Sequence, residues 1–218
     1  MPEEIICLDM DNTILYSDRV HIAAFQRAFR KNGLPKVPPA KLKELFGLIA
    51  KEMIRIIFPD IKPGILNRVV RDHDRSVVND TAKYARVIHD VKKSLNLLKR
   101  QYKLALLSNC KHVEVIAILK AAGIKASTFS AIVGNDDVAR PKPDPEEIRR
   151  AMKKAGLSKG YMVGDTVYDI RAGKAAGLKT IAVLTGHHSR KRLKKENPDY
   201  ILKSAAGLPR LLLGQNCP

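Results

Sequence analysis

Charged and polar side chains follow short apolar segments at several points of the sequence. Near the N-terminus, Asp9 and Asp11 come directly after the run Ile5-Ile6-Cys7-Leu8. Two carboxylates at positions i and i+2 can lie on the same side of an extended chain. At the carboxyl end of a parallel strand they would face the crevice in which α/β sheets bind ligands. This spacing suits acid–base, nucleophilic or metal chemistry at a sheet edge.

Three later segments carry further candidate residues. In two of them polar residues follow an apolar run, and in the third a lysine lies between two prolines. Ser108-Asn109 follows residues 104–107, and Asp165, with Asp169 four residues on, follows residues 161–163. Lys142 lies between Pro141 and Pro143, which leave its backbone little freedom. Each feature alone could be a helix cap or a turn. Their occurrence in order at the ends of apolar runs favours a shared site.

The elements that would position these residues alternate between strands and helices. Five short apolar runs predict buried strands at residues 5–8, 104–107, 131–133, 161–163 and 180–184. Helices are predicted at residues 91–98, 113–122, 146–155 and 168–176, and a glycine follows each of the last three. The alternation predicts an α/β fold with a doubly wound, Rossmann-like parallel sheet.

Residues 16–89 break this alternation. Ile22, Phe25, Ala28 and Phe29 recur at helical spacing, and further helices fit residues 41–46, 48–57 and from 65 to about 78. We therefore expect a core domain formed by residues 1–15 and 90–218, with an inserted α-helical cap domain at residues 16–89.

Composition limits the class of protein. Forty Lys and Arg residues against twenty-two Asp and Glu give a net charge of +18, which favours anionic partners such as phosphates or nucleic acid. The dense basic segment 189–195 has few aromatic neighbours, and we interpret it as a solvated face. No apolar run is long enough to span a membrane. The chain is therefore expected to be soluble, and nucleic acid is an unlikely partner.

Cysteine and histidine spacing gives no metal motif. Cys7, Cys110 and Cys217 are far apart with no CxxC pair, which indicates a reducing, cytoplasmic location and makes a disulfide scaffold unlikely. The six histidines show no HxH or HExxH spacing, and we assign them no role.

Together, the segments DMDNT (9–13), LLSN (106–109), RPKPDP (140–145) and GDTVYD (164–169) resemble the four motifs of the haloacid dehalogenase superfamily. The resemblance is to its phosphoglycolate-phosphatase-like group, which carries a helical cap after the first motif. It implies an enzyme, a phosphoric monoester hydrolase that works through an aspartyl-phosphate. Dehalogenases of the superfamily expel halide and lack the acid at position 11, so Asp11 favours phosphoryl transfer.

The resemblance also assigns roles. Asp9 would be the nucleophile, Asp11 the general acid and base, and Ser108, Asn109 and Lys142 would bind the phosphoryl group. Mg²⁺, which prefers oxygen ligands, would be held by Asp9, Asp165 and the Asp11 carbonyl. Asp169 would act at the same metal site through a water molecule or by orienting Lys142.

The substrate is less defined than the chemistry. A small phosphorylated metabolite such as 2-phosphoglycolate is expected, with its carboxylate bound by a cap cation, for which Arg55 is the first candidate and Lys43 the second. Two alternatives remain at this stage, a sugar-phosphate mutase resembling β-phosphoglucomutase and a basic nucleic-acid-binding protein with a vestigial site. Neither the substrate nor the oligomeric state follows from the sequence.

Overall fold

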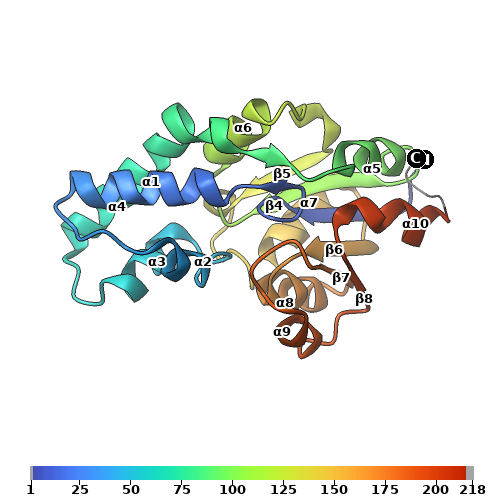
Figure 1. Ribbon diagram of the computed structural model, residues 1–218. Coiled ribbons are helices and arrows are strands. Elements are labelled where there is room, and N and C mark those ends of the chain that lie inside the picture. Colours follow the sequence, from blue (N-terminus) through green and yellow to red (C-terminus); the bar gives the residue numbers. More distant parts are fainter. Residues whose placement is uncertain (1, 215–218) are drawn as a thin grey trace.

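The computed structural model describes residues 2–214, so Cys217 lies outside the described residues. Its main feature is a parallel six-stranded sheet in the order β5-β4-β1-β6-β7-β8 (Figure 1). The strands are β1 (Ile5–Asp9), β4 (Lys103–Ser108), β5 (Ala131–Gly134), β6 (Gly160–Gly164), β7 (Lys179–Val183) and β8 (Tyr200–Leu202). The first five confirm the predicted strands, and β8 is an edge strand that the sequence analysis missed.

Alternate residues of β1 face opposite sides of the sheet, and each side is covered by helices. Ile6 and Leu8 lie in one apolar cluster with residues of α5 (Val91–Leu98), α6 (His112–Ala121) and α10 (Leu208–Leu213). Ile5 and Cys7 lie in a second cluster with residues of α7 (Glu146–Ala155) and α8 (Val167–Ala175). Burial on both faces explains why the strands read as continuous apolar runs. The doubly wound fold is confirmed.

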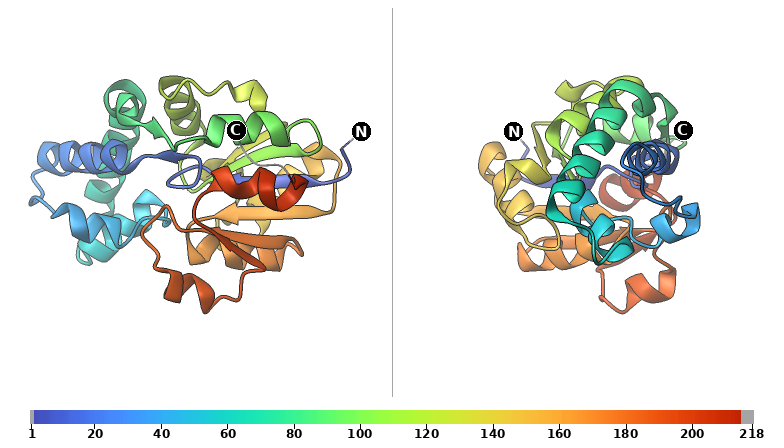
Figure 2. Two further views of the ribbon diagram at one scale, coloured as in Figure 1. Left: turned by 45° about the vertical axis from the view of Figure 1, so that its right-hand side comes forward. Right: turned by 90° about the vertical axis from the view of Figure 1, so that its left-hand side faces the viewer.

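The inserted cap is formed by helices α1 (Asp18–Lys31), α2 (Pro39–Lys43), α3 (Ala50–Ile57) and α4 (Pro63–Ser76), as predicted in kind. They share their own apolar cluster, which includes Phe25, Phe29, Ile54 and Val69. A π-turn, η1 (Val77–Thr81), and a 3₁₀ turn, η2 (Ala82–Tyr84), follow α4. In Figure 2 these helices lie beyond one end of the sheet.

Two short strands join the cap to the core. β2 (Leu15–Tyr16) pairs in antiparallel fashion with β3 (Arg86–Val87). The expectation of an entirely helical insert was therefore wrong. Each strand has two residues, too few to show an alternating pattern in the sequence. The division at residues 16 and 89 stays a prediction, although this ribbon lies at both ends of the insert.

The remaining elements are short. They are α9 (Arg190–Lys194) and the 3₁₀ turns η3 (Ala126–Thr128), η4 (Asn135–Asp137) and η5 (Ala205–Gly207). In α9, Leu193 is buried while the neighbouring basic side chains are exposed, in keeping with a solvated basic face. Among residues 2–214, no helix combines the length and apolar character needed to cross a bilayer.

Candidate active site

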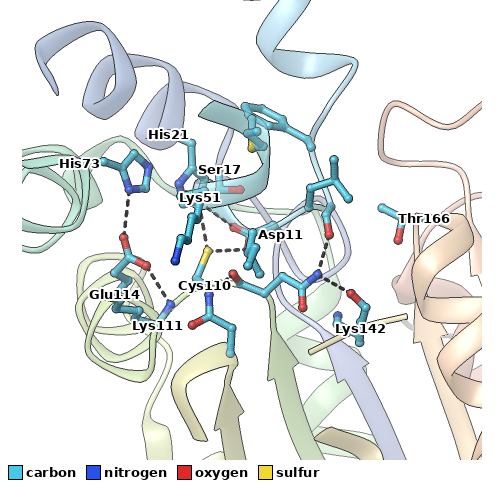
Figure 3. Close-up of a pocket in the computed structure, with 18 of the residues that line it drawn as sticks. Asp11, Ser17, His21, Lys51, His73, Cys110, Lys111, Glu114, Lys142 and Thr166 are labelled. Atoms are coloured by element: carbon cyan, nitrogen blue, oxygen red, sulfur yellow. Dashed lines mark hydrogen bonds and ion pairs between the residues drawn. The ribbon is translucent and has the colours of Figure 1, made fainter. Parts of the chain in front are cut away.

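The predicted site residues meet at the carboxyl edge of the central strands. Asp9 ends β1, Ser108 ends the neighbouring β4, and Asp165 follows β6 on the other side of β1. Chain connections leave β1 and β6 in opposite directions, and ligands bind at such a switch point in open α/β sheets. A cavity of about 480 Å³ lies there, lined by core and cap residues (Figure 3).

Lys142 is held between two carboxylates at the floor of this cavity. Its Nζ lies 2.6 Å from Asp9 Oδ1 and 2.8 Å from Asp169 Oδ1, and all three residues are buried. Burial alone would lower the pKa of the lysine, but the charges of Asp169 and Asp9 raise it well above its usual value. Lys142 is therefore a permanent, fixed cation beside the predicted nucleophile.

Asp9, Asp165 and Asp169 form a buried acidic group. One carboxylate oxygen from each lies within 4.8 Å of the others. Burial raises the pKa of Asp9 well above its usual value. The positive charge of Lys142 opposes this shift, and the neighbouring carboxylates add to it. Burial and the charge of Asp169 raise the pKa of Asp165 likewise. Such a group of oxygen ligands could hold a hard divalent cation.

Hydrogen bonds from two threonines orient the acidic group. Asp165 Oδ1 accepts a hydrogen bond of 3.1 Å from the Thr13 hydroxyl. Asp169 Oδ2 accepts from the Thr166 amide at 3.0 Å and the Thr166 hydroxyl at 2.6 Å, closing the capping box of α8. The predicted helix start was one residue late, since α8 begins at Val167. Asp169 nevertheless reaches the site from the first turn of α8.

Gly186 allows the loop after β7 to approach the acidic group. A Cβ atom at this position would lie 1.7 Å from Asp165 Oδ2. Only glycine therefore fits here without displacing the Asp165 carboxylate.

Asp11 points away from Lys142, toward residues of the cap and of the β4–α6 loop. Its carboxylate accepts a hydrogen bond of 3.2 Å from the Ser108 hydroxyl and lies 3.3 Å from His21 Nε2 and 3.5 Å from Cys110 Sγ. Burial would raise the pKa of Asp11, but the hydrogen bond and charge of His21 outweigh it, and the pKa is lowered. Asp11 thus lies at the boundary between core and cap.

Asn109 connects the two parts of the site. Its amide nitrogen donates to the Gly47 carbonyl of the cap at 2.6 Å and to the Lys142 carbonyl at 3.0 Å. Gly47 has φ +101°, and a Cβ atom there would lie 2.9 Å from side-chain atoms of Thr166 and Tyr168. The cap loop at Gly47 can therefore rest directly on the core only because it has no side chain.

The structure does not place Arg55 at the cavity. Met53, Ile54 and Ile57 occupy the buried face of α3, which leaves Arg55 exposed and absent from the cavity lining. Its predicted contact with substrate is therefore not supported. Lys43, the second candidate, lies 2.9 Å from Asp18 and is also absent from the lining.

Other cap cations do reach the cavity. Lys51, on the first turn of α3, and Arg71, on α4, both line it, and Lys111 does so from the core. Lys51 lies one helical turn before Arg55 on nearly the same face of α3, so their positions along the helix axis separate the two.

Several cavity residues that carry imidazole or thiol groups were not predicted from the sequence. His21, His73, His187, His188 and Cys110 all line the cavity. They come from α1, α4 and the loops after β7 and β4, so no sequence spacing could have joined them. A partial signal existed in α1, where His21 precedes the buried Phe25 by one helical turn.

His188 is neutral and oriented by the backbone. Its Nδ1 accepts a hydrogen bond of 3.0 Å from the Val167 amide, and its buried Nε2 has no hydrogen-bond partner among the described residues. Burial and then the charge of Arg192 lower its pKa to about 4.

The family model described as haloacid dehalogenase-like hydrolase matches residues 6–183, which include all four segments at this site. The chain belongs to this family. A pyrophosphatase of Bacillus velezensis is 27% identical over 214 residues, covering 93% of each chain. A phosphoglycolate phosphatase of Aquifex aeolicus is also 27% identical over 214 residues, covering 95% of this chain and 96% of its own.

Solved structures agree with the fold. A haloacid dehalogenase-like hydrolase from Bacteroides fragilis superposes with a TM-score of 0.87 at 19% identity and covers 95% of this chain and all of its own. The expected family and fold are confirmed.

Proposed function

We propose that this chain is a Mg²⁺-dependent phosphatase that hydrolyses a small phosphate monoester through an aspartyl-phosphate on Asp9. The observation that carries the proposal is the contact of Lys142 with Asp9 and Asp169 inside the buried acidic group. A phosphate dianion repels an anionic nucleophile, so hydrolysis needs fixed positive charge at this point.

The residues present fit Mg²⁺. The donor set Asp9, Asp165 and Asp169 is all oxygen and buried. Asp9 and Asp169 share the single ammonium group of Lys142, so negative charge is left to be neutralised. Asp9, Asp165 and the Asp11 carbonyl would hold the ion, with Asp169 assisting through Lys142. When bound, the ion supplies positive charge at the phosphoryl oxygens.

The chain's own groups account for both chemical steps. In the first, Asp9 attacks phosphorus, the bond from phosphorus to the leaving oxygen breaks, and Asp11, protonated in the substrate complex, gives its proton to that oxygen. In the second, Asp11 takes a proton from water as the water attacks phosphorus and releases Asp9. Lys142, Ser108 and Asn109 would bind the phosphoryl group, and the loop at Gly47 would limit the access of water.

The cavity favours a small, acidic substrate. Its volume of about 480 Å³ is near the low end of ordinary ligand pockets. Lys51 and Arg71 line its cap side and would bind a carboxylate beyond the phosphate, as in 2-phosphoglycolate. This chemistry, and the phosphoglycolate phosphatase among the relatives, support a phosphorylated acid. The cytoplasmic location stays a prediction.

Release of inorganic phosphate with Mg²⁺ tests the proposal. The panel contains 2-phosphoglycolate, p-nitrophenyl phosphate, inorganic pyrophosphate and β-glucose 1-phosphate with a glucose bisphosphate activator. We expect hydrolysis of the monoesters, with 2-phosphoglycolate preferred, and loss of that activity in Asp9→Asn. Preference for pyrophosphate would overturn the substrate class, and isomerisation of glucose 1-phosphate without release of phosphate would indicate a mutase.

A further inference from the structure

Three different ligand atoms meet beside the predicted general acid. His21 Nε2 lies 3.3 Å from Asp11 Oδ1 and 3.6 Å from Cys110 Sγ, and Cys110 Sγ lies 3.5 Å from Asp11 Oδ2. Figure 3 shows these side chains pointing toward one another from α1, the loop after β1 and the loop after β4. They form a compact nitrogen, oxygen and sulfur group that does not include the oxygens of Asp9 or Asp165.

Two of the distances match the edges of a zinc tetrahedron. With ordinary zinc bonds of about 2.3 Å to sulfur and about 2.0 to 2.2 Å to nitrogen and oxygen, tetrahedral angles give edges of about 3.6 Å for sulfur–nitrogen, about 3.4 Å for nitrogen–oxygen and about 3.6 Å for sulfur–oxygen. With Asp11 Oδ1 as the oxygen ligand, the observed sulfur–nitrogen and nitrogen–oxygen distances are 3.6 and 3.3 Å, and the 3.5 Å contact of Cys110 Sγ is with the other oxygen, Oδ2. Each neighbour uses a different oxygen of Asp11, so the ion would lie against the edge of that carboxylate.

We propose that Asp11, His21 and Cys110 form a Zn²⁺-binding site, distinct from the Mg²⁺ site, whose occupation inhibits the enzyme. Imidazole and thiolate select zinc over magnesium, which prefers oxygen ligands. Three protein ligands leave one tetrahedral position open, and all three residues line the cavity through which an ion can enter.

Neighbouring rings orient His21 for this role. The ring of His73 stacks on it with centroids 5.7 Å apart and an interplanar angle of 14°, and Phe46 contacts it edge-on at 6.2 Å. Burial followed by the charge of Asp11 raises the pKa of the Cys110 thiol, so the thiol is protonated in the metal-free protein. As the bonds to zinc form, the Cys110 thiol proton and any proton on His21 Nε2 leave for solvent.

The inhibition part of this inference rests on the proposed function, because it assumes that Asp11 is the general acid. A carboxylate bound to zinc can neither give its proton to a leaving alkoxide nor take one from water. Zinc would therefore stop turnover even when Mg²⁺ is bound at the acidic group of Asp9 and Asp165. Zinc binding itself requires no assumption about activity.

Metal titration of the full-length protein tests the site. In excess Mg²⁺, we expect one Zn²⁺ to bind by calorimetry, and Co²⁺ as a probe to give the near-ultraviolet charge-transfer band of a cobalt–thiolate bond. Cys110→Ser should remove the band and weaken Zn²⁺ binding by more than about 100-fold, since loss even of an outer partner weakens metal sites by about 10- to 100-fold. Cys110→Ala provides a second variant if the first misfolds.

Cys7→Ala and Cys217→Ser are the matched controls. Cys7 is buried in the sheet, where burial raises the pKa of its thiol to about 12, and both variants should keep the band and the affinity. A wild-type cobalt complex without a thiolate band, or equal zinc affinity in Cys110→Ser, overturns the site. Zinc inhibition that persists in Cys110→Ser overturns its link to inhibition. Metal binding without any phosphatase activity in the wild type would refute only the proposed function.

Discussion

Replacing Lys142 by methionine should both unfold the protein more easily and stop turnover. At an effective dielectric constant of 20, each contact of Nζ, at 2.6 Å with Asp9 and 2.8 Å with Asp169, has a gross Coulomb energy of about 6 kcal/mol. Desolvation of the three buried groups offsets most of this energy, and removing one partner from a buried ion pair typically destabilises a protein by about 3 to 5 kcal/mol. For a chain of this size, that loss corresponds to a fall in Tm of about 6 to 20 °C.

The measurement is thermal and urea unfolding in EDTA, followed by the same curves with Mg²⁺. The variant should recover part of its lost stability with Mg²⁺, because the ion replaces some of the missing positive charge. Lys153→Met removes an exposed lysine from α7 and serves as the matched control. If the two variants had equal Tm values, or if Lys142→Met kept activity within tenfold of the wild type, the electrostatic reasoning would be refuted.

Three further predictions follow from the same geometry. Lys51→Ala should raise KM for 2-phosphoglycolate by about 10- to 150-fold, as expected for loss of a charge-assisted contact, and leave KM for p-nitrophenyl phosphate nearly unchanged. Arg55→Ala on the same helix is the control. Equal effects of the two variants would disprove a Lys51 contact. Gly186→Ala places a Cβ 1.7 Å from Asp165 Oδ2 and so displaces that carboxylate. The Mg²⁺ concentration for half-maximal activity should rise by about 10- to 100-fold, and an unchanged value would show that Asp165 is not a ligand. EDTA should abolish phosphate release, with recovery in Mg²⁺ but not in Ca²⁺, whose looser and higher coordination misplaces the nucleophile; full activity in EDTA would exclude a metal requirement.

The sequence predicted best those elements whose role imposes a repeated pattern. Strand β1 is buried on both faces, so its apolar run was unambiguous, and helix α7 was predicted with the bounds that the structure shows. Gly156 ends that helix with φ 67°, the left-handed conformation that its position suggested. Strand β8, with three residues at the sheet edge, lacks the buried run that identified the others.

Site residues could be predicted where they lie in a recognisable sequence segment. Contacts between elements far apart in the sequence could not. Asp9 and Ser108 end strands and Asp165 follows one, and parallel topology brings these strand ends together. Lys142 lies between two prolines. Arg55 was misplaced because the sequence does not show how far along α3 the cavity extends: Lys51 in the first turn lines it, and Arg55 one turn later on nearly the same face does not. The contact of His21 with Cys110 depends on the docking of cap on core.

Covalent capture of the phosphorylated enzyme tests the central claim most directly. In Asp11→Asn, p-nitrophenyl phosphate should still phosphorylate Asp9, since its leaving group needs no proton, while loss of the base slows hydrolysis of the acyl phosphate. Rapid quenching followed by borohydride reduces an aspartyl-phosphate to homoserine, which peptide mass spectrometry locates. The account predicts homoserine at position 9. A burst of nitrophenolate without homoserine at that position, or with the modification at another residue, would contradict it.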